Sequence, residues 1–217
     1  MKENNKYVSF IFDDGFQTEY LYALPLFNKY NVKACTAVIS NKIDGYKDET
    51  NEKHLSLEEL NELQKNGWEI LSHTRTHKDL TLLSLEEVEE ELEGSKKDLM
   101  SLGFEVNNLV YPLHKQNLEI QRIAKKYYRS GRAGTQIPNV YPINNFYNLN
   151  SILIDDLRLL ITYNRNFQIK QNSWIIFYCH LCKSKIIKTS IEERLQTVES
   201  LIVNSLMNNY NILTVNE

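Results

Sequence analysis

The sequence predicts an α/β fold with a parallel sheet. Short apolar runs rich in Val, Ile and Phe alternate with segments of helical periodicity along all 217 residues, which is the pattern of repeated strand and helix units. Residues 174–179 are apolar throughout, as expected for a strand that is covered on both faces. No linker, repeat or low-complexity tract divides the chain, so we expect one domain over residues 1–217.

The elements follow from local periodicity and turn residues. Runs of β-branched and aromatic residues predict strands over residues 7–12, 33–39, 69–71, 107–111, 128–130, 149–154, 174–179 and 212–215. Apolar residues at helical spacing predict helices over 18–30, 57–66, 85–102, 117–126 and 191–208, and another within 157–170. Residues 131–148 contain two prolines and are expected to form a loop.

Three helix starts have the signature of a capping box. Ser56, Ser84 and Ser190 are each followed three residues later by Glu, so the serine hydroxyl and the glutamate carboxylate can satisfy each other's backbone amides. Gly67 and Gly103 lie just beyond two of the predicted helix ends, where glycine commonly ends a helix.

Composition excludes several classes of protein. The formal net charge is −3 and the sequence pI is about 6.0, so no basic excess points to nucleic acid. Three cysteines, Cys35, Cys179 and Cys182, do not make a disulfide framework and are expected to be buried thiols. No apolar run reaches the roughly 18–20 residues of a membrane span. No signal peptide is visible, which favours a cytoplasmic location, or a secreted or cell-surface one if a leader was removed.

Polar side chains follow the predicted strands directly. They include two carboxylates, an arginine and four imidazoles: Asp13, Asp14, His73, His77, His114, Arg132 and His180. Since the carboxyl ends of parallel strands lie at one edge of the sheet, we expect these groups to converge there.

The converging groups indicate metal-assisted hydrolysis. His73 and His77 together with one carboxylate form a common catalytic zinc set that leaves a position open for water. The other carboxylate can take a proton from that water, and a protonated His180 can give one to a departing nitrogen or oxygen. Each group alone also has an ordinary structural interpretation, since Asp-Asp-Gly is a turn signal and a lone strand histidine is often a core residue.

Three motifs in order resemble the polysaccharide deacetylase family, the NodB-homology group of carbohydrate esterases. They are Phe12-Asp13-Asp14-Gly15, Ser72-His73-Thr74-Arg75-Thr76-His77, and the apolar strand that ends in His180. The resemblance covers essentially the whole chain. It implies a distorted (β/α)7 barrel that removes N-acetyl groups from an amino-sugar-containing polysaccharide or glycan precursor.

The resemblance also implies a role for each matched residue. Asp13 corresponds to the general base and His180 to the general acid. Asp14, His73 and His77 correspond to the ligands of a divalent metal, usually zinc in this family.

A further motif of the family, its third in chain order, lies between the histidine motif and the strand that ends in His180, and here this chain departs from the family pattern. The family commonly has Arg-Pro-Pro-Tyr-Gly, whereas this chain has Val110 followed by Tyr111, Pro112, Leu113 and His114, closer to an Ala-Tyr-Pro-Phe-Gly variant. In the family the Tyr of this motif helps to hold the oxyanion through its backbone amide, and the resemblance implies that Leu113 can keep this role. We expect the last four residues to bind substrate, with Tyr111 packing near sugar rings; the other interpretation of His114 is a peripheral position.

In the family, the arginine of this motif steadies the general base, and in this chain Val110 stands at its position. We hypothesise that Arg132, which follows the fifth strand, takes its place beside Asp13; the other interpretation is a surface loop residue. The aspartate that orients His180 has no clear match. Asp155 and Asp156 are the nearest candidates. Both are explained at least as well by a capped turn before a helix as by a role beside His180.

One histidine and one tryptophan are not expected to take part in the chemistry. His54 lies in a polar loop and is expected to be solvated, and Trp174 is expected to pack in the strand core.

Two other functions remain open at this point. The chain could hydrolyse another carbon–nitrogen amide, such as a formamide or a cyclic amide. It could also be an inactive carbohydrate-binding relative, an interpretation that the complete set of Asp13, Asp14, His73, His77 and His180 opposes and the altered third motif supports.

Overall fold

The computed structural model describes residues 6–44, 47, 52–155, 172–183 and 187–217. Its strands are β1 Lys6–Asp14, β2 Cys35–Val38, β3 Glu69–Ser72, β4 Asn108–Val110, β5 Ser130–Arg132, β6 Asn139–Val140, β7 Ile152–Leu153, β8 Ser173–Cys179 and β9 Asn211–Ile212. Its α-helices are α1 Leu24–Lys29, α2 Leu57–Lys65, α3 Leu85–Ser101, α4 Leu118–Tyr127 and α6 Ile191–Met207.

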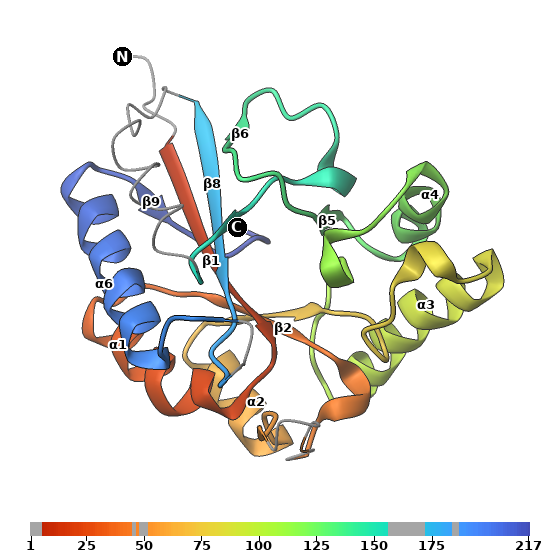
Figure 1. Cartoon of the computed structure of the whole chain (residues 1–217), viewed down its shortest axis with the longest axis horizontal. Coiled ribbons are helices and arrows are strands. Elements are labelled where there is room, and N and C mark those ends of the chain that lie inside the picture. The colour runs from red at the N-terminus through yellow and green to blue at the C-terminus, as the bar shows by residue number, and fades with distance from the viewer. Residues whose placement is uncertain (1–5, 45–46, 48–51, 156–171, 184–186) are drawn as a thin grey trace.

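Strand β1 lies at the centre of the sheet. It pairs in parallel with β2 on one side and with β8 on the other, so that Phe12 lies opposite Thr36 and Cys179. The neighbours run β5-β4-β3-β2-β1-β8, and Figure 1 shows β1 and β8 side by side through the middle of the molecule. This order brings the ends of strands that are distant in sequence to one edge.

The sheet closes on itself through the segment before β7. Arg132 at the end of β5 forms a parallel bridge with Leu149, and the Leu149 amide donates to the Gly131 carbonyl at 2.9 Å. Strand β7 then pairs in parallel with β8. The predicted distorted (β/α)7 barrel is therefore confirmed; it is distorted because closure depends on one isolated bridge and a two-residue strand.

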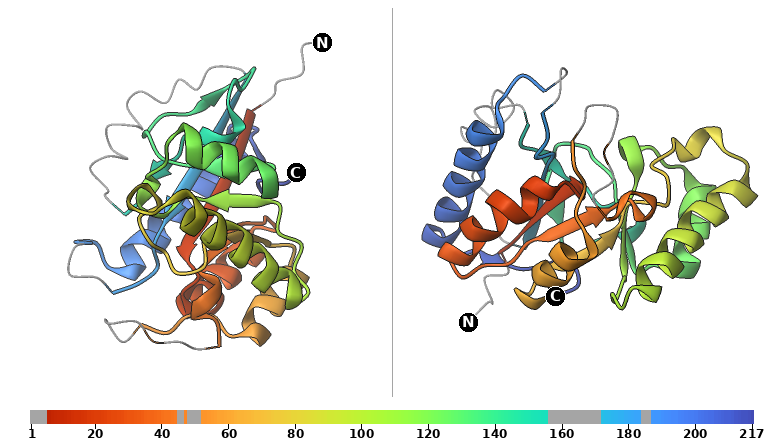
Figure 2. Two further views of the ribbon diagram at one scale, coloured as in Figure 1. Left: turned by 90° about the vertical axis from the view of Figure 1, so that its right-hand side faces the viewer. Right: turned by 90° about the horizontal axis from the view of Figure 1, so that it is seen from below.

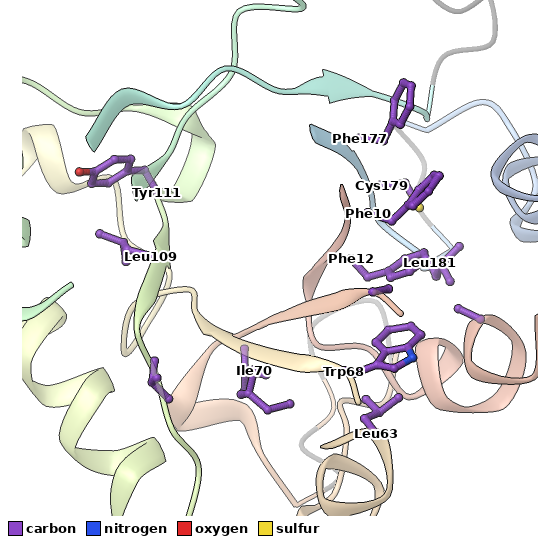
Figure 3. Packing of buried hydrophobic residues seen from close by; sticks show 14 of the residues in the cluster. Phe10, Phe12, Leu63, Trp68, Ile70, Leu109, Tyr111, Phe177, Cys179 and Leu181 are labelled. Atoms are coloured by element: carbon purple, nitrogen blue, oxygen red, sulfur yellow. The ribbon is translucent and has the colours of Figure 1, made fainter. Parts of the chain in front are cut away.

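Alternating residues of the central strands pack on opposite sides. Phe10 and Phe12 point outward beneath the helices, where Phe12 stacks on Trp68 with ring centroids 5.4 Å apart. Figure 3 shows Phe10 on β1 beside Phe177 and Cys179 on β8 in this outer core. The period of two that the strand geometry imposes leaves the other residues to fill the barrel.

Apolar side chains fill the interior of the barrel, and polar side chains lie at the carboxyl ends of its strands. Ile11, Val110, Leu149 and Ile176 belong to the buried inner cluster. Trp174 lies there too, and its indole N–H donates to the Ser9 hydroxyl at 2.9 Å, which confirms its predicted place in the core.

A cavity of about 730 Å³ lies at the amino ends of the strands, lined by the aromatic side chains Tyr7, Tyr141, Phe146 and Trp174 and by residues 213–217. Strand β1 runs from Tyr7 at this cavity to Asp13, a span of roughly 20 Å at the usual rise of a strand. The cavity is therefore separate from the polar end of the barrel.

The helices cover the outside of the barrel in pairs. Figure 2 shows α1 beside α6 and α3 beside α4. Glu199 on α6 accepts hydrogen bonds from Lys29 at 2.6 Å and from the Tyr30 hydroxyl at 2.7 Å. All three predicted capping boxes are present, at Ser56, Ser84 and Ser190.

The helix predicted over 18–30 is present at nearly those bounds, as a π-helical turn, Glu19–Ala23, that continues into α1. One predicted strand boundary is wrong for an identifiable reason. The strand predicted over 128–130 begins at Ser130 instead. Tyr128 is the C-cap residue that follows α4, and its hydroxyl donates into the core to the Leu92 carbonyl at 2.6 Å. Its aromatic character thus serves packing and not a strand.

Other differences concern the second half of the chain. The predicted loop over 131–148 contains β6, whose Asn139 pairs antiparallel with Trp174. The strands predicted over 149–154 and 212–215 are shorter, at Ile152–Leu153 and Asn211–Ile212. The helix predicted within 157–170 lies outside the described residues.

The three cysteines are buried thiols, as the sequence predicts. Cys35, Cys179 and Cys182 are buried free thiols. Within the described ranges, no helix has the length and apolar character that crossing a membrane requires.

Candidate active site

The turn after β1 separates two neighbouring carboxylates. Asp13 is the second-last residue of β1 and is buried, whereas Asp14 ends the strand with a positive φ of 78°. Gly15 follows in the same left-handed region, at φ 69°, which a side chain would disfavour. This turn directs Asp14 toward one group of side chains and Asp13 toward another.

Asp14 lies among the two histidines of the loop that follows β3. Its Oδ1 is 3.5 Å from Nε2 of His73 and 3.4 Å from Nε2 of His77. One ligand atom from each of the three residues falls within 4.8 Å of the others. Both imidazoles therefore face one carboxylate at a single point.

The donor set fits a divalent metal. Nδ1 of His73 is 2.8 Å from the Val110 carbonyl, which can only accept, so Nδ1 carries the hydrogen and Nε2 keeps its lone pair. Burial lowers the pKa of His73 to about 4 and also lowers the pKa of His77, so both rings are neutral at pH 7. The buried Asp14 Oδ1 has no hydrogen-bond partner among the described residues. Two neutral imidazoles and a carboxylate oxygen without a hydrogen bond are ligands of the kind that zinc takes.

Asp13 forms a buried ion pair with Arg132. The Arg132 guanidinium donates through Nη2 to Asp13 Oδ2, and each side chain is almost fully buried. Burial raises the pKa of Asp13, but the charge of Arg132, followed by those of the nearby histidines, outweighs this effect and lowers the pKa to about 2. Asp13 is therefore an ionised carboxylate at neutral pH.

Arg132 is held in place by groups on several elements. Its guanidinium carbon lies 4.5 Å from the centroid of the Tyr178 ring, a cation–π contact. Its Nη1 is 3.3 Å from Nδ1 of His114 and 3.4 Å from the Ser151 hydroxyl. Arg132 is thus a buried residue of this site and not a surface loop residue.

His180 follows β8 and is paired with Asp155. Its Nδ1 is 2.6 Å from Asp155 Oδ2, its backbone amide donates to Oδ1 at 3.1 Å, and its Nε2 is 3.9 Å from Asp13 Oδ2. Burial lowers the pKa of His180, but the hydrogen bond with Asp155 and the nearby carboxylates outweigh it and raise the pKa to about 9. The imidazole is therefore protonated at neutral pH. Asp156, the other candidate, lies outside the described residues.

The third motif places its residues in different environments. Tyr111 is fully buried, and in Figure 3 it lies beside Leu109 in the outer core; the expectation that it contacts a sugar does not fit this burial. Pro112 is also buried. Leu113 is 55% exposed, and His114 is half-buried with its ring 4.7 Å from that of Tyr178.

The expectation that His54 is solvated is wrong. It is buried, and its Nδ1 donates to the Asp14 carbonyl at 2.9 Å. An antiparallel bridge joins His54 to Phe16, and their rings lie 4.8 Å apart. His54 therefore supports the turn that carries Asp13 and Asp14. A polar local sequence gave no sign of this long-range contact.

Sequence reasoning also missed a buried arginine behind His180. Arg194 on α6 donates to the His180 carbonyl and, at 2.6 Å, to the Cys182 carbonyl. It is 1% exposed, so it fixes the backbone on either side of Leu181. Its place on the buried face of an amphipathic helix is the one signal that could have identified it.

Comparison with known proteins gives a consistent result. Residues 1–129 match the family model described as polysaccharide deacetylase. The curated protein YxkH of Bacillus subtilis, whose name refers to polysaccharide deacetylases, is 32% identical over 126 residues, which are 58% of this chain and 43% of that protein. The match thus spans less than half of the curated relative.

Solved structures share the fold at lower identity. The Xyl-CE4 domain of a multidomain xylanase from the hindgut metagenome of Trinervitermes trinervoides aligns with a TM-score of 0.67 at 20% identity, over 98% of this chain and 89% of that one. A CE4 family pseudoenzyme from Bacillus anthracis aligns with a TM-score of 0.66 at 16% identity, over 98% and 65%. The fold alone therefore does not establish activity. Because the family model matches more than half of the sequence, the chain belongs to the polysaccharide deacetylase family.

Proposed function

We propose that this protein is a metal-dependent hydrolase that removes N-acetyl groups from an amino-sugar-containing polysaccharide or glycan precursor. The observation that carries the proposal is the arrangement of an ionised carboxylate and a protonated imidazole beside a metal-ligand set. His180 Nε2 lies 3.9 Å from Asp13 Oδ2, and Asp14 is the next residue after Asp13. A base, an acid and metal ligands thus share the carboxyl end of the barrel.

In this proposal Asp14, His73 and His77 hold a divalent metal, with zinc the best match to the donors. When bound, such an ion lowers the pKa of a coordinated water toward neutrality and polarises a carbonyl oxygen. The neutral state of both histidines and the unpartnered Asp14 oxygen support this assignment.

Asp13 and His180 would divide the proton transfers. Asp13 accepts a proton from water as the water oxygen bonds to the acetyl carbon, and Arg132 keeps Asp13 ionised for this step. His180 gives its Nε2 proton to the amide nitrogen as the carbon–nitrogen bond breaks, which releases acetate and a free amine. Asp155 holds the opposite nitrogen of the ring, so that Nε2 faces Asp13.

Residues of the third motif would contact the sugar at the opening of the site. The exposed Leu113 and the half-buried His114 are the members of that motif available to a substrate. Pro112 and Tyr111 would support them from below. The catalytic unit that we propose comprises residues 1–217.

Acetate release tests this function directly. The purified chain, loaded with Zn²⁺, is incubated with N-acetylglucosamine oligomers, a formylated amine and a small cyclic amide, and acetate, formate and ring opening are measured in parallel. We expect acetate release that a chelator abolishes and added Zn²⁺ restores. Formate release or ring opening alone would indicate the other amide hydrolases. Binding of the oligomers without any hydrolysis would indicate an inactive carbohydrate-binding protein.

A further inference from the structure

The loop that carries both histidine ligands has an unusual backbone. Thr74 and His77 both have a φ of 63°, a left-handed conformation that residues other than glycine adopt only where surrounding contacts fix it. Between them, the amides of Arg75 and Thr76 have to find acceptors outside the loop. The spacing of the two imidazoles depends on this segment.

Glu91 of helix α3 supplies those acceptors. Its Oε2 accepts the Arg75 amide at 3.0 Å and the Thr76 amide at 2.8 Å, and its Oε1 accepts the Thr76 hydroxyl. Glu91 is only 6% exposed. A buried carboxylate is costly unless it is hydrogen-bonded, and charge-assisted bonds to backbone amides are among the strong ones. Glu91 makes no ion pair with any described residue, so these hydrogen-bond donors compensate for its burial.

Glu91 belongs to a polar stripe on the face of α3 that meets the site. Ser95 and Asp98 follow at helical spacing. The Ser95 hydroxyl lies 2.9 Å from that of Ser72 at the end of β3, and Asp98 accepts from the Arg75 guanidinium at 2.9 Å. Three polar residues on a packed helix face all contact β3 or its following loop, which packing alone does not require.

We propose that Glu91 is a positioning residue for the metal site: it fixes the backbone between His73 and His77 and thereby sets their separation for one ion. This inference rests on the metal site of the proposed function and assigns it a support on another element. Groups that orient metal ligands typically change metal affinity by about 10–100-fold when they are removed. Glu91 would act on the ligands through their backbone.

The test is the affinity of the full chain for Zn²⁺, measured by competition with a chromophoric chelator. Glu91→Gln places an amide NH₂ among N–H donors, and we expect it to weaken Zn²⁺ binding by at least tenfold. Glu90→Gln removes the same charge from the adjacent, exposed position of α3 and should leave the affinity within about twofold of the original. Circular dichroism measures the fraction of each variant that is folded, and the Kd for Zn²⁺ is calculated from the concentration of folded protein.

A second pair of variants covers the case in which Glu91→Gln does not fold. Thr76→Val removes the hydroxyl that bonds to Glu91 and should weaken Zn²⁺ binding, whereas Thr76→Ser keeps the hydroxyl and should restore it. Folded variants of both residues with the original Kd would overturn the proposal, as would an original protein without Zn²⁺ affinity. If the original chain binds Zn²⁺ tightly yet releases no acetate, the proposed activity fails while the role of Glu91 is still decided by Kd.

Discussion

Arg132 and Asp13 lie 119 positions apart in sequence and form one buried ion pair across the interior of the barrel. Arg132 ends β5 and Asp13 lies near the end of β1, and three strands separate them along the sheet. The sheet has to curve for the two side chains to meet. Closure of the barrel, and not local sequence, therefore creates the pair.

Removal of Arg132 should impair catalysis through Asp13. Arg132→Met takes away the charge that most strongly lowers the pKa of Asp13, so that pKa rises and the acidic limb of the pH–rate profile moves to higher pH. We expect kcat/KM at neutral pH to fall by on the order of 100-fold. Arg129→Met, at an exposed arginine nearby in sequence, serves as the control. Unchanged turnover at neutral pH in Arg132→Met would sink the assignment.

Asp155 should set the alkaline limb of the same profile. His180 as an acid has to be protonated, and its pKa is raised to about 9 although burial alone would lower it, because Asp155 bonds to its Nδ1. Asp155→Asn keeps an oxygen for the His180 amide but removes the charge, so the pKa falls and activity is lost at a lower pH. We expect a loss on the order of tenfold or more at pH 7. An alkaline limb that stays in place in this variant argues against His180 as the acid.

Loss of one imidazole should remove the metal without unfolding the chain. His77 is 26% exposed, so His77→Ala leaves only a small gap at the end of the barrel. We expect Zn²⁺ affinity to fall on the order of 100-fold or more and acetate release to disappear, while the circular dichroism spectrum stays the same. Lys78→Ala, the exposed neighbour, is the matched control. Zn²⁺ bound at the original affinity by His77→Ala refutes this ligand assignment.

The sequence predicts helices and strands better than it predicts the long-range side-chain contacts between them. Ser84 and Glu87 lie three residues apart, so the capping box that they form is a local property. The rule that strand ends converge likewise predicts that Asp13 and His180 approach each other. By contrast, the contact of His54 with Asp14 joins residues 40 positions apart in sequence, and no periodicity encodes it.

The choice between candidate partners also required three-dimensional information. Asp155 and Asp156 are adjacent in sequence after the same predicted strand, and the sequence does not say which one meets His180. Glu91 is a related case. A carboxylate at a core-facing position of α3 signals a buried partner, yet the partner is the backbone of another loop and leaves no mark in the sequence.

Gly131 should be intolerant of a side chain because the ring of Tyr111 packs closely against its backbone. A Cβ on Gly131 would lie 2.6 Å from the ring and from the hydroxyl oxygen of Tyr111, and that side chain is fully buried. Since Tyr111 cannot move into solvent, Gly131→Ala should lower the free energy of unfolding by about 1–3 kcal/mol, measured by urea denaturation.

Gly94 provides the matched control for that substitution. Its Cβ would meet only the flexible side chain of Arg75, at 3.1 Å, and Gly94 lies inside helix α3, where alanine is favoured by roughly 0.5–1 kcal/mol. Gly94→Ala should therefore leave stability unchanged or raise it. Equal stability of both variants would show that the buried Tyr111 shifts at little cost, and the close contact with Gly131 would then not limit this position.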